Sequence, residues 1–176
     1  MAVALAPLAL SGTGLFNLAT ASKDVTITID PTGADRIRAQ LTGVSSLAIL
    51  IKSNSAIGFA DVYEKAGRQA SIITDLGDPS AMSISQARTA MAASCKPGID
   101  ASLYGRIGNV DVSKMSMFIG RADTKIDGDL YIYNCKLKKL DSAPVLLAFN
   151  AMGMDGGQAE KVVGGAMALK VLEVTK

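Results

Sequence analysis

The stretch from Met115 to Leu140 constrains the fold most strongly, because it has the pattern of a β-hairpin. Residues 130–137 alternate between two faces, as the period of two in a β-strand requires. Residues 115–119 show a similar alternation, and the turn-rich middle contains Asp127-Gly128, a dipeptide that strongly favours a hairpin turn. We therefore predict that a hairpin turning at Asp127-Gly128 forms the centre of a sheet-based domain.

Several other segments also have the composition and period of strands. Residues 23–30 place β-branched apolar residues on one face and threonines on the other, which predicts a half-buried strand. Apolar or alternating runs predict further strands at 46–52, 56–64, 70–76, 143–152 and 166–175. Together with the hairpin, these segments favour a largely antiparallel sheet.

The clearest helical pattern covers residues 80–95, where apolar residues recur with a period near 3.6 in an Ala-rich sequence. Lys96-Pro97-Gly98 ends this helix, because proline cannot continue the hydrogen-bonded ladder. A shorter helix is predicted over Pro31–Leu41, with Asp30 as its N-cap. The resulting prediction is a mainly β domain, a β-sandwich or barrel of largely antiparallel strands, with one flanking helix around 80–95.

The first residues of the chain differ in character from the rest. Met1 to Ala21 contains no charged residue, and Ala19-Thr20-Ala21 resembles a signal-peptide cleavage site. However, no Lys or Arg precedes the apolar run, and proline and glycine interrupt it well short of the roughly 20 residues that a membrane span needs. We therefore predict an extended apolar arm at 1–22, which packs on its own domain or on a neighbouring subunit, and a single β-rich domain with an inserted helix at 23–176.

The composition excludes several kinds of chemistry. The chain has no histidine, which removes His-based acid–base catalysis, Ser-His-Asp and Cys-His triads and the commonest zinc ligand. The formal charge of +2 comes from basic and acidic residues that are mixed along the chain, not clustered as a nucleic-acid-binding surface requires. Hydrophobic residues make up 49% of the sequence, which indicates either a core of small aliphatic residues or apolar surface buried against other copies.

The two cysteines, Cys95 and Cys135, lie 40 positions apart, and neither has a CxxC partner. A count of two cysteines neither makes nor excludes a disulfide. We expect two buried thiols, with an intramolecular or inter-subunit bridge as the alternative.

Two segments resemble ligand-binding loops but lack residues that the chemistry requires. Ser11–Asn17 is glycine-rich, but Asn17 occupies the third glycine position of the dinucleotide fingerprint and no strand precedes the segment. Asp123–Asp129 resembles the start of a calcium loop, but Lys125 stands where an oxygen ligand is required. We therefore predict no cofactor and no metal site, although the two aspartates that follow Lys125 could hold an ion loosely.

Paired carboxylates and paired glycines are the remaining candidates for a site. Asp75 and Asp78 have the residue type for acid–base work, but they stand beside turn residues, where aspartate is favoured for backbone hydrogen bonds alone. Gly156-Gly157 and Gly164-Gly165 would permit either a close approach of backbones or a bend in a strand. Nothing in these spacings indicates catalytic residues, and we predict that the chain is not an enzyme.

In its general layout the chain resembles virion proteins of tailed bacteriophages, such as tail-tube subunits and head-decoration proteins. The resemblance covers the whole chain: an apolar arm, several strands, one flanking helix and no catalytic or cofactor motif. It implies a structural subunit of a ring, tube or lattice of identical copies, in a virion assembled in the host cytoplasm. Its partners would be other copies and other virion proteins, without specific nucleic-acid recognition and without membrane insertion.

Within that resemblance a tail-tube protein is the main expectation and a head-decoration protein the alternative. A β-domain that binds a small molecule or carbohydrate is the other alternative. Such binding sites usually present Trp, Tyr or His beside polar groups, and the chain has neither Trp nor His. The sequence therefore favours self-assembly over ligand binding.

Overall fold

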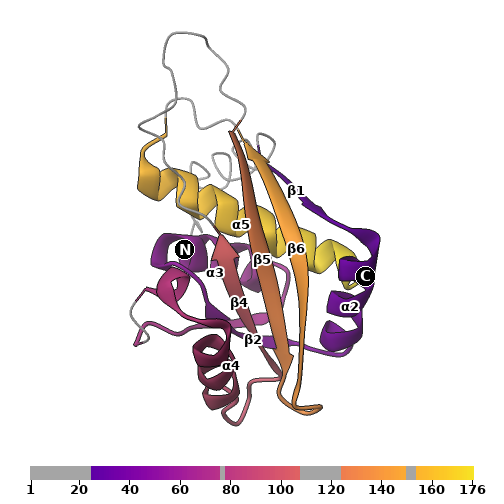
Figure 1. Cartoon of the computed structure of the whole chain (residues 1–176). Helices are drawn as coiled ribbons and strands as arrows, with labels where there is room; N and C mark the ends of the chain where they lie inside the picture. Colours follow the sequence, from indigo (N-terminus) through magenta and orange to yellow (C-terminus); the bar gives the residue numbers. More distant parts are fainter. Residues whose placement is uncertain (1–24, 76–77, 108–123, 150–153) are drawn as a thin grey trace, which may run out of the picture.

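A six-stranded mixed sheet forms the centre of the protein. The structure, a computed structural model, describes residues 25–75, 78–107, 124–149 and 154–176 (Figure 1). The elements follow in the order β1 (Val25–Ile29), α2 (Pro31–Leu41), β2 (Ser46–Leu50), α3 (Ser53–Lys65), β3 (Gln69–Ile72), η2 (Pro79–Ala81), α4 (Ile84–Ala93), β4 (Ala101–Ile107), β5 (Thr124–Asn134), β6 (Lys139–Phe149) and α5 (Gly156–Val174). The predicted arm at 1–22, the segment Ser11–Asn17 and residues 115–119 lie outside the described residues.

The sheet has a parallel half and an antiparallel half, in the strand order β1-β6-β5-β4-β2-β3. β2 is parallel to both of its neighbours, β3 and β4. Along the rest of the sheet, each of β4, β5, β6 and β1 is antiparallel to the next. Parallel pairs need crossover connections, which explains why α3 and α4 lie between β2, β3 and β4 in the chain.

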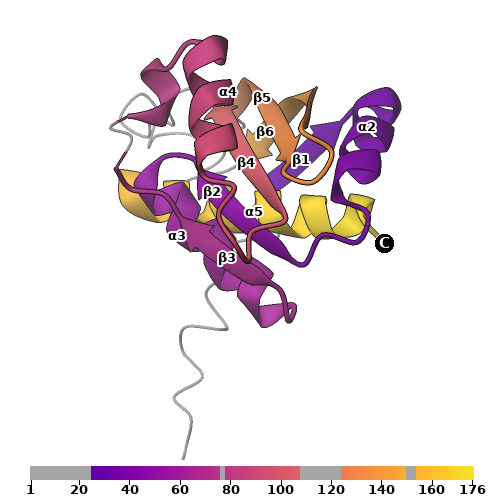
Figure 2. The same ribbon diagram turned by 90° about the horizontal axis from the view of Figure 1, so that it is seen from below.

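Helices cover both faces of the sheet (Figure 2). α3 and α5 lie side by side on one face, and α2 adds Ile37 and Leu41 to the same apolar core. α4 lies on the opposite face, where Ala87 and Met91 pack against Tyr104 and two tyrosines of β5. The larger core therefore lies between the sheet and α2, α3 and α5, and a smaller core lies under α4.

The two helices predicted from the sequence are confirmed, and their caps explain where they begin. The Asp30 carboxylate accepts a hydrogen bond of 2.7 Å from the N–H of Gly33, at the start of α2. Ser83 and Gln86 form a capping box at the start of α4. Strands at 25–29 and 46–50 also lie within segments that the sequence predicts as strands.

The prediction of a mainly β sandwich or barrel with one helix is wrong, because two predicted strands are helices. Residues 56–64 belong to α3, and residues 166–174 belong to α5. Short apolar runs fit either period, and residues 162–168 are all buried because α5 packs against both the sheet and α3. The local signal for α5 is instead the Asp155–Gln158 capping box that precedes its apolar residues.

The predicted hairpin with its turn at Asp127-Gly128 is wrong, and the hairpin in the structure is a different one, formed by β5 and β6. β5 continues through Gly128, which pairs with β4 on one side and β6 on the other. The turn lies at residues 135–138, where Lys138 has a positive φ of 52°. Asn134 Oδ1 accepts hydrogen bonds from two backbone N–H groups of this turn. An asparagine side chain, and not the Asp-Gly dipeptide, therefore stabilises the turn of the β5–β6 hairpin.

The expectation of two buried thiols is also wrong, because Cys95 and Cys135 form an intramolecular disulfide. Cys95 follows α4 and Cys135 follows β5, and the packing of α4 on the sheet brings their Cα atoms to 5.5 Å. That separation lies in the range that a disulfide spans. The bridge ties the C-terminal end of α4 to the sheet.

Candidate functional site

The carboxyl ends of the parallel strands β2, β3 and β4 meet at one edge of the sheet. Ligands of open α/β sheets usually bind outside this edge. The polar groups that follow or end these strands, together with the start of α5, are named the carboxyl-edge cluster. Its members are Lys52, Asn54, Asp78, Arg106 and Glu160.

Three members of the carboxyl-edge cluster bind one another. Lys52 Nζ lies 2.6 Å from Glu160 Oε1, and Asn54 Nδ2 donates a hydrogen bond of 3.1 Å to Glu160 Oε2. The Glu160 side chain is only 13% exposed, whereas that of Lys52 is 48% exposed. Because both oxygens of its carboxylate are occupied, Glu160 holds the first turn of α3 against α5 and is not a free base.

Asp78 and Tyr104 hold the segment that follows β3. The hydroxyl and the N–H of Ser80 donate hydrogen bonds of 2.7 and 3.0 Å to Asp78 Oδ1, and these bonds lower the pKa of Asp78. Tyr104 Oη donates a hydrogen bond of 2.7 Å to the backbone carbonyl of Pro79, and burial raises the pKa of the Tyr104 phenol. Neither group therefore has a pKa tuned toward neutrality, as a general acid or base would need.

One carboxylate holds together the opposite edge, where β2 and β4 begin. Asp100 Oδ2 accepts four hydrogen bonds of 2.9–3.0 Å, from the backbone N–H and the hydroxyl of both Ser45 and Ser46. The N–H of Asp100 donates in return to the Ser46 hydroxyl. The backbone N–H of Ser45 contributes most to lowering the pKa of Asp100, since hydrogen bonds favour the charged carboxylate. This arrangement stabilises the fold by joining the starts of β2 and β4.

Replacing Asp100 with asparagine should lower the free energy of unfolding by about 1–3 kcal/mol near neutral pH, because an amide oxygen accepts these bonds without a charge. The pKa of Asp100 is lower in the folded chain than its usual value of 3.8, so its contribution is present above that value and is lost as the pH falls through the folded value. Urea denaturation of both proteins at about pH 6 and about pH 3 measures the difference. A difference that grew at the lower pH would contradict this account, and Asp75→Asn, at an exposed position, is the control.

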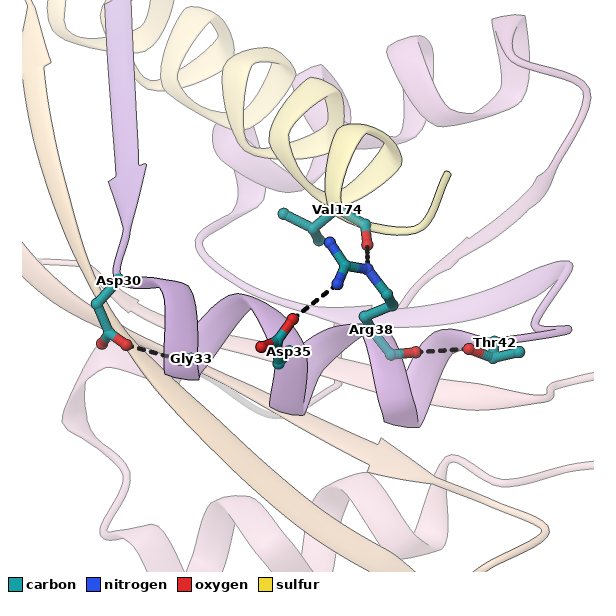
Figure 3. A network of polar contacts seen from close by, with 6 residues as sticks. All are labelled: Asp30, Gly33, Asp35, Arg38, Thr42 and Val174. Atoms are coloured by element: carbon teal, nitrogen blue, oxygen red, sulfur yellow. Dashed lines mark hydrogen bonds and ion pairs between the residues drawn. The ribbon is translucent and has the colours of Figure 1, made fainter.

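Arg38 links α2 to the C-terminal end of α5 (Figure 3). Its Nε donates a hydrogen bond of 2.9 Å to the backbone carbonyl of Val174. The last carbonyls of a helix lack intrahelical partners and carry partial negative charge. A guanidinium there both donates a hydrogen bond to an unpaired carbonyl and interacts favourably with this charge. Arg38 also pairs with Asp35 at 2.7 Å, but both side chains are more than half exposed and that pair contributes little. This network is therefore structural.

One part of the sheet has no described helix over it (Figure 1). On the face that carries α4, the outward side chains of β1, β6, the first half of β5 and the end of β4 are exposed or half-buried. This surface is named the open face, and its members are Thr26, Thr28, Arg106, Lys125, Asp127, Asp129, Pro144, Leu146 and Ala148. Two of these residues are basic and two are acidic, so the open face carries no net charge.

The candidates singled out in the sequence are not brought together. Asp127 and Asp129 lie two positions apart on the continuous strand β5, and not in a calcium loop. Asp75 and Asp78 lie on the connection between β3 and α4, where Asp78 caps η2. The paired glycines at 164–165 do mark a close approach of backbones, but it is an approach of α5 to α3 and not a bend in a strand.

Sequence reasoning missed both the carboxyl-edge cluster and the Asp100 site. Lys52 and Glu160 come together only because α3 and α5 pack side by side, and no local pattern indicates that packing. Ser45 and Asp100 each precede a strand and Ser46 begins one, and such residues are typical of any turn. Their mutual hydrogen bonds depend on the parallel pairing of β2 with β4.

Within the described ranges, no group of three or more His, Cys, Asp or Glu side chains is placed to hold a metal ion. None of the helices in these ranges is long and apolar enough to cross a membrane. The chain matches no protein-family model and no curated protein sequence.

Proposed function

We propose that this chain is a structural subunit of an assembly of identical copies. One observation carries the proposal: the sheet ends in two strands, β1 and β3, that each have a single neighbour among the described strands. β1 contains no charged residue and no proline. Natural proteins protect the edges of sheets with charged residues, prolines, bulges or covering segments, since an open edge pairs readily with another chain. β1 is therefore suited to pairing between copies.

The distribution of polar contacts supports the same proposal. Glu160, Asp78 and Asp100 all have hydrogen-bond partners within the chain. The bonds of Glu160 and Asp100 hold secondary-structure elements together, and those of Asp78 cap η2. The open face has no net charge and does not repel an identical surface. In the described part of the chain, the edge strands and the open face are thus surfaces that remain available to a partner.

The finer form of the proposal is a virion component, such as a tail-tube subunit, with a head-decoration protein as the alternative. A β-barrel layout no longer supports it, since the fold is mixed α/β. The Cys95–Cys135 bridge is compatible with it, because disulfides persist in oxidising surroundings outside the cell. A particle assembled in the host cytoplasm would then form this bridge after release.

The native mass of the chain tests the proposed assembly. Light scattering after size exclusion, over a series of concentrations, should give masses that are multiples of 18.2 kDa and that rise with concentration. Negative-stain microscopy of the same samples should show regular particles at the highest concentrations. A chain that stays monomeric throughout the series would overturn the proposal.

A ligand-binding module is the second candidate, and the carboxyl-edge cluster is the observation that favours it. Lys52 is 48% exposed at the start of α3, where no side chain caps the helix. Unpaired N–H groups at helix starts attract anions. A monomeric chain whose melting temperature rises with small anions, in a way that Lys52→Ala abolishes, would favour this candidate over assembly.

A further inference from the structure

The edge strand β1 has nearly the same sequence in both directions. Residues 25–29 read Val-Thr-Ile-Thr-Ile, with apolar β-branched residues at both ends and at the centre. Burial follows the same symmetry. Thr26 and Thr28 are exposed, whereas Val25, Ile27 and Ile29 each keep 8% exposure beside the larger core. In both chemistry and burial, the strand is therefore close to symmetric about Ile27.

Antiparallel pairing of two such strands about Ile27 would match every residue with a similar one. Thr26 would face Thr28 of the second copy, Val25 would face Ile29, and Ile27 would face itself. The threonine pairs would lie on the open face, and the apolar pairs would continue the larger core from one copy into the next. Threonine pairs and pairs of β-branched residues are among the favourable cross-strand combinations.

We propose that β1 is a two-fold interface at which two copies of this chain pair antiparallel and join their sheets into one. This inference rests on the proposed assembly and names its contact surface. A two-fold axis through Ile27 brings the same five residues of each copy together, which is the simplest closed symmetry for identical chains.

Within its five residues, β1 fits an identical strand in charge as well as in symmetry, because none of these residues is charged. The open face next to β1 balances Arg106 and Lys125 against two aspartates, so its extension by a second copy adds no net charge. β3, the other edge strand, runs Gln-Ala-Ser-Ile and has no such symmetry.

The size of the contact sets its strength. A pair of strands of five residues each buries less than the roughly 1,000 Å² that a stable complex usually needs. We therefore expect association through β1 alone to be in the micromolar range or weaker, and to be reinforced when other surfaces also bind. Sedimentation velocity over a wide range of concentrations is the measurement suited to such an interface.

Charge substitutions on the exposed side of β1 test the pairing. In the double variant Thr26→Lys/Thr28→Lys, each lysine would face a lysine of the second copy, and the dissociation constant should rise at least about tenfold. Thr26→Glu/Thr28→Glu should weaken association in the same way. An equimolar mixture of the two variants should restore it, because every lysine then faces a glutamate. Both threonines are exposed, so circular dichroism should show an unchanged fold.

The outcomes separate this interface from the assembly itself. Ser71→Lys, an exposed position on β3, is the matched control and should leave association unchanged. Association that neither double variant weakens would overturn the β1 interface and leave the assembly standing. Weakening that the mixture does not restore would overturn the register about Ile27. A wild-type chain that is monomeric at every concentration would overturn both proposals.

Discussion

Gly164→Ala should prevent folding or lower the free energy of unfolding by about 3–5 kcal/mol. A Cβ atom at Gly164 would lie 1.9 Å from the backbone oxygen of Ser55 in α3. Gly58→Ala should have a similar effect, since a Cβ atom there would lie 1.9 Å from the backbone oxygen of Lys161 in α5. Each obstacle is backbone and not the end of a flexible side chain, so α3 and α5 would have to move apart.

The separation of α3 from α5 is costly because both helices belong to the larger core. Phe59 of α3 and Val163, Met167 and Val171 of α5 are buried in that core. Moving the helices apart would open cavities around these side chains, and such cavities are not offset by other contacts. Alanine is a better helix former than glycine by about 1 kcal/mol, which offsets only a small part of the loss.

Two other glycines of α5 provide matched controls for the same substitution. A Cβ atom at Gly165 would lie 3.3 Å from Cγ2 of Val62, a side chain that can shift, so Gly165→Ala should cost about 1 kcal/mol. A Cβ atom at Gly156 would have nothing within 4 Å, so Gly156→Ala should be neutral or slightly stabilising. Chemical denaturation of the four single variants measures the series. Wild-type stability in Gly164→Ala would show that α3 and α5 are not in this close contact.

Replacing both Cys95 and Cys135 with serine should lower the free energy of unfolding by about 4 kcal/mol. The size of this loss follows from the loop of 40 residues that the bridge closes. A cross-link over such a loop lowers the entropy of the unfolded chain, which stabilises the folded chain by about 4 kcal/mol. The loss should concentrate at α4, whose fully buried residues are only Ala87 and Met91. Hydrogen exchange should therefore become faster in α4 before it does in α2, α3 or α5.

Reduction of the wild-type chain is the control for the serine variant. A reducing agent should lower the denaturation midpoint of the wild-type chain to that of the double serine variant and should leave the variant unchanged. An effect of the reducing agent on the variant would indicate a cause other than the bridge. Stability that is equal with and without the bridge would show that α4 is held only by its packing against Tyr104 and the two tyrosines of β5. In the proposed virion, this measurement also gives the stability that the chain would gain after release.

The sequence predicted the elements whose signals are local. Strict alternation of β-branched residues identified the strand at 25–29, since one of its faces is buried and the other is exposed. The helix at 31–41 was predicted from Asp30 and Pro31 at its start, and the helix around 80–95 from its period near 3.6, its alanine content and the Lys96-Pro97-Gly98 stop. In the structure, Asp30 and the Ser83–Gln86 pair satisfy backbone N–H groups at the starts of these helices. These interactions span only a few residues and do not depend on the rest of the fold.

The errors fall on segments whose structure depends on packing. α5 is covered by the sheet and by α3, so its apolar residues have neither a helical stripe nor a strict alternation. The Asp127-Gly128 dipeptide favours a turn by itself, but pairing of Gly128 with strands on both sides keeps it in an extended strand. The candidate site was missed for the same reason, because Lys52 and Glu160 meet across two packed helices.

The sequence by itself therefore determined the caps, the alternating strand β1 and the absence of histidine chemistry, since each is a property of neighbouring residues or of composition. Only the tertiary structure decided that Cys95 meets Cys135, that Gly58 and Gly164 face a neighbouring backbone, and that β1 lies at an edge of the sheet. The physical reason is the same in all three cases. Contacts between residues far apart in the chain arise from the packing of whole elements, and local patterns do not encode which elements pack together.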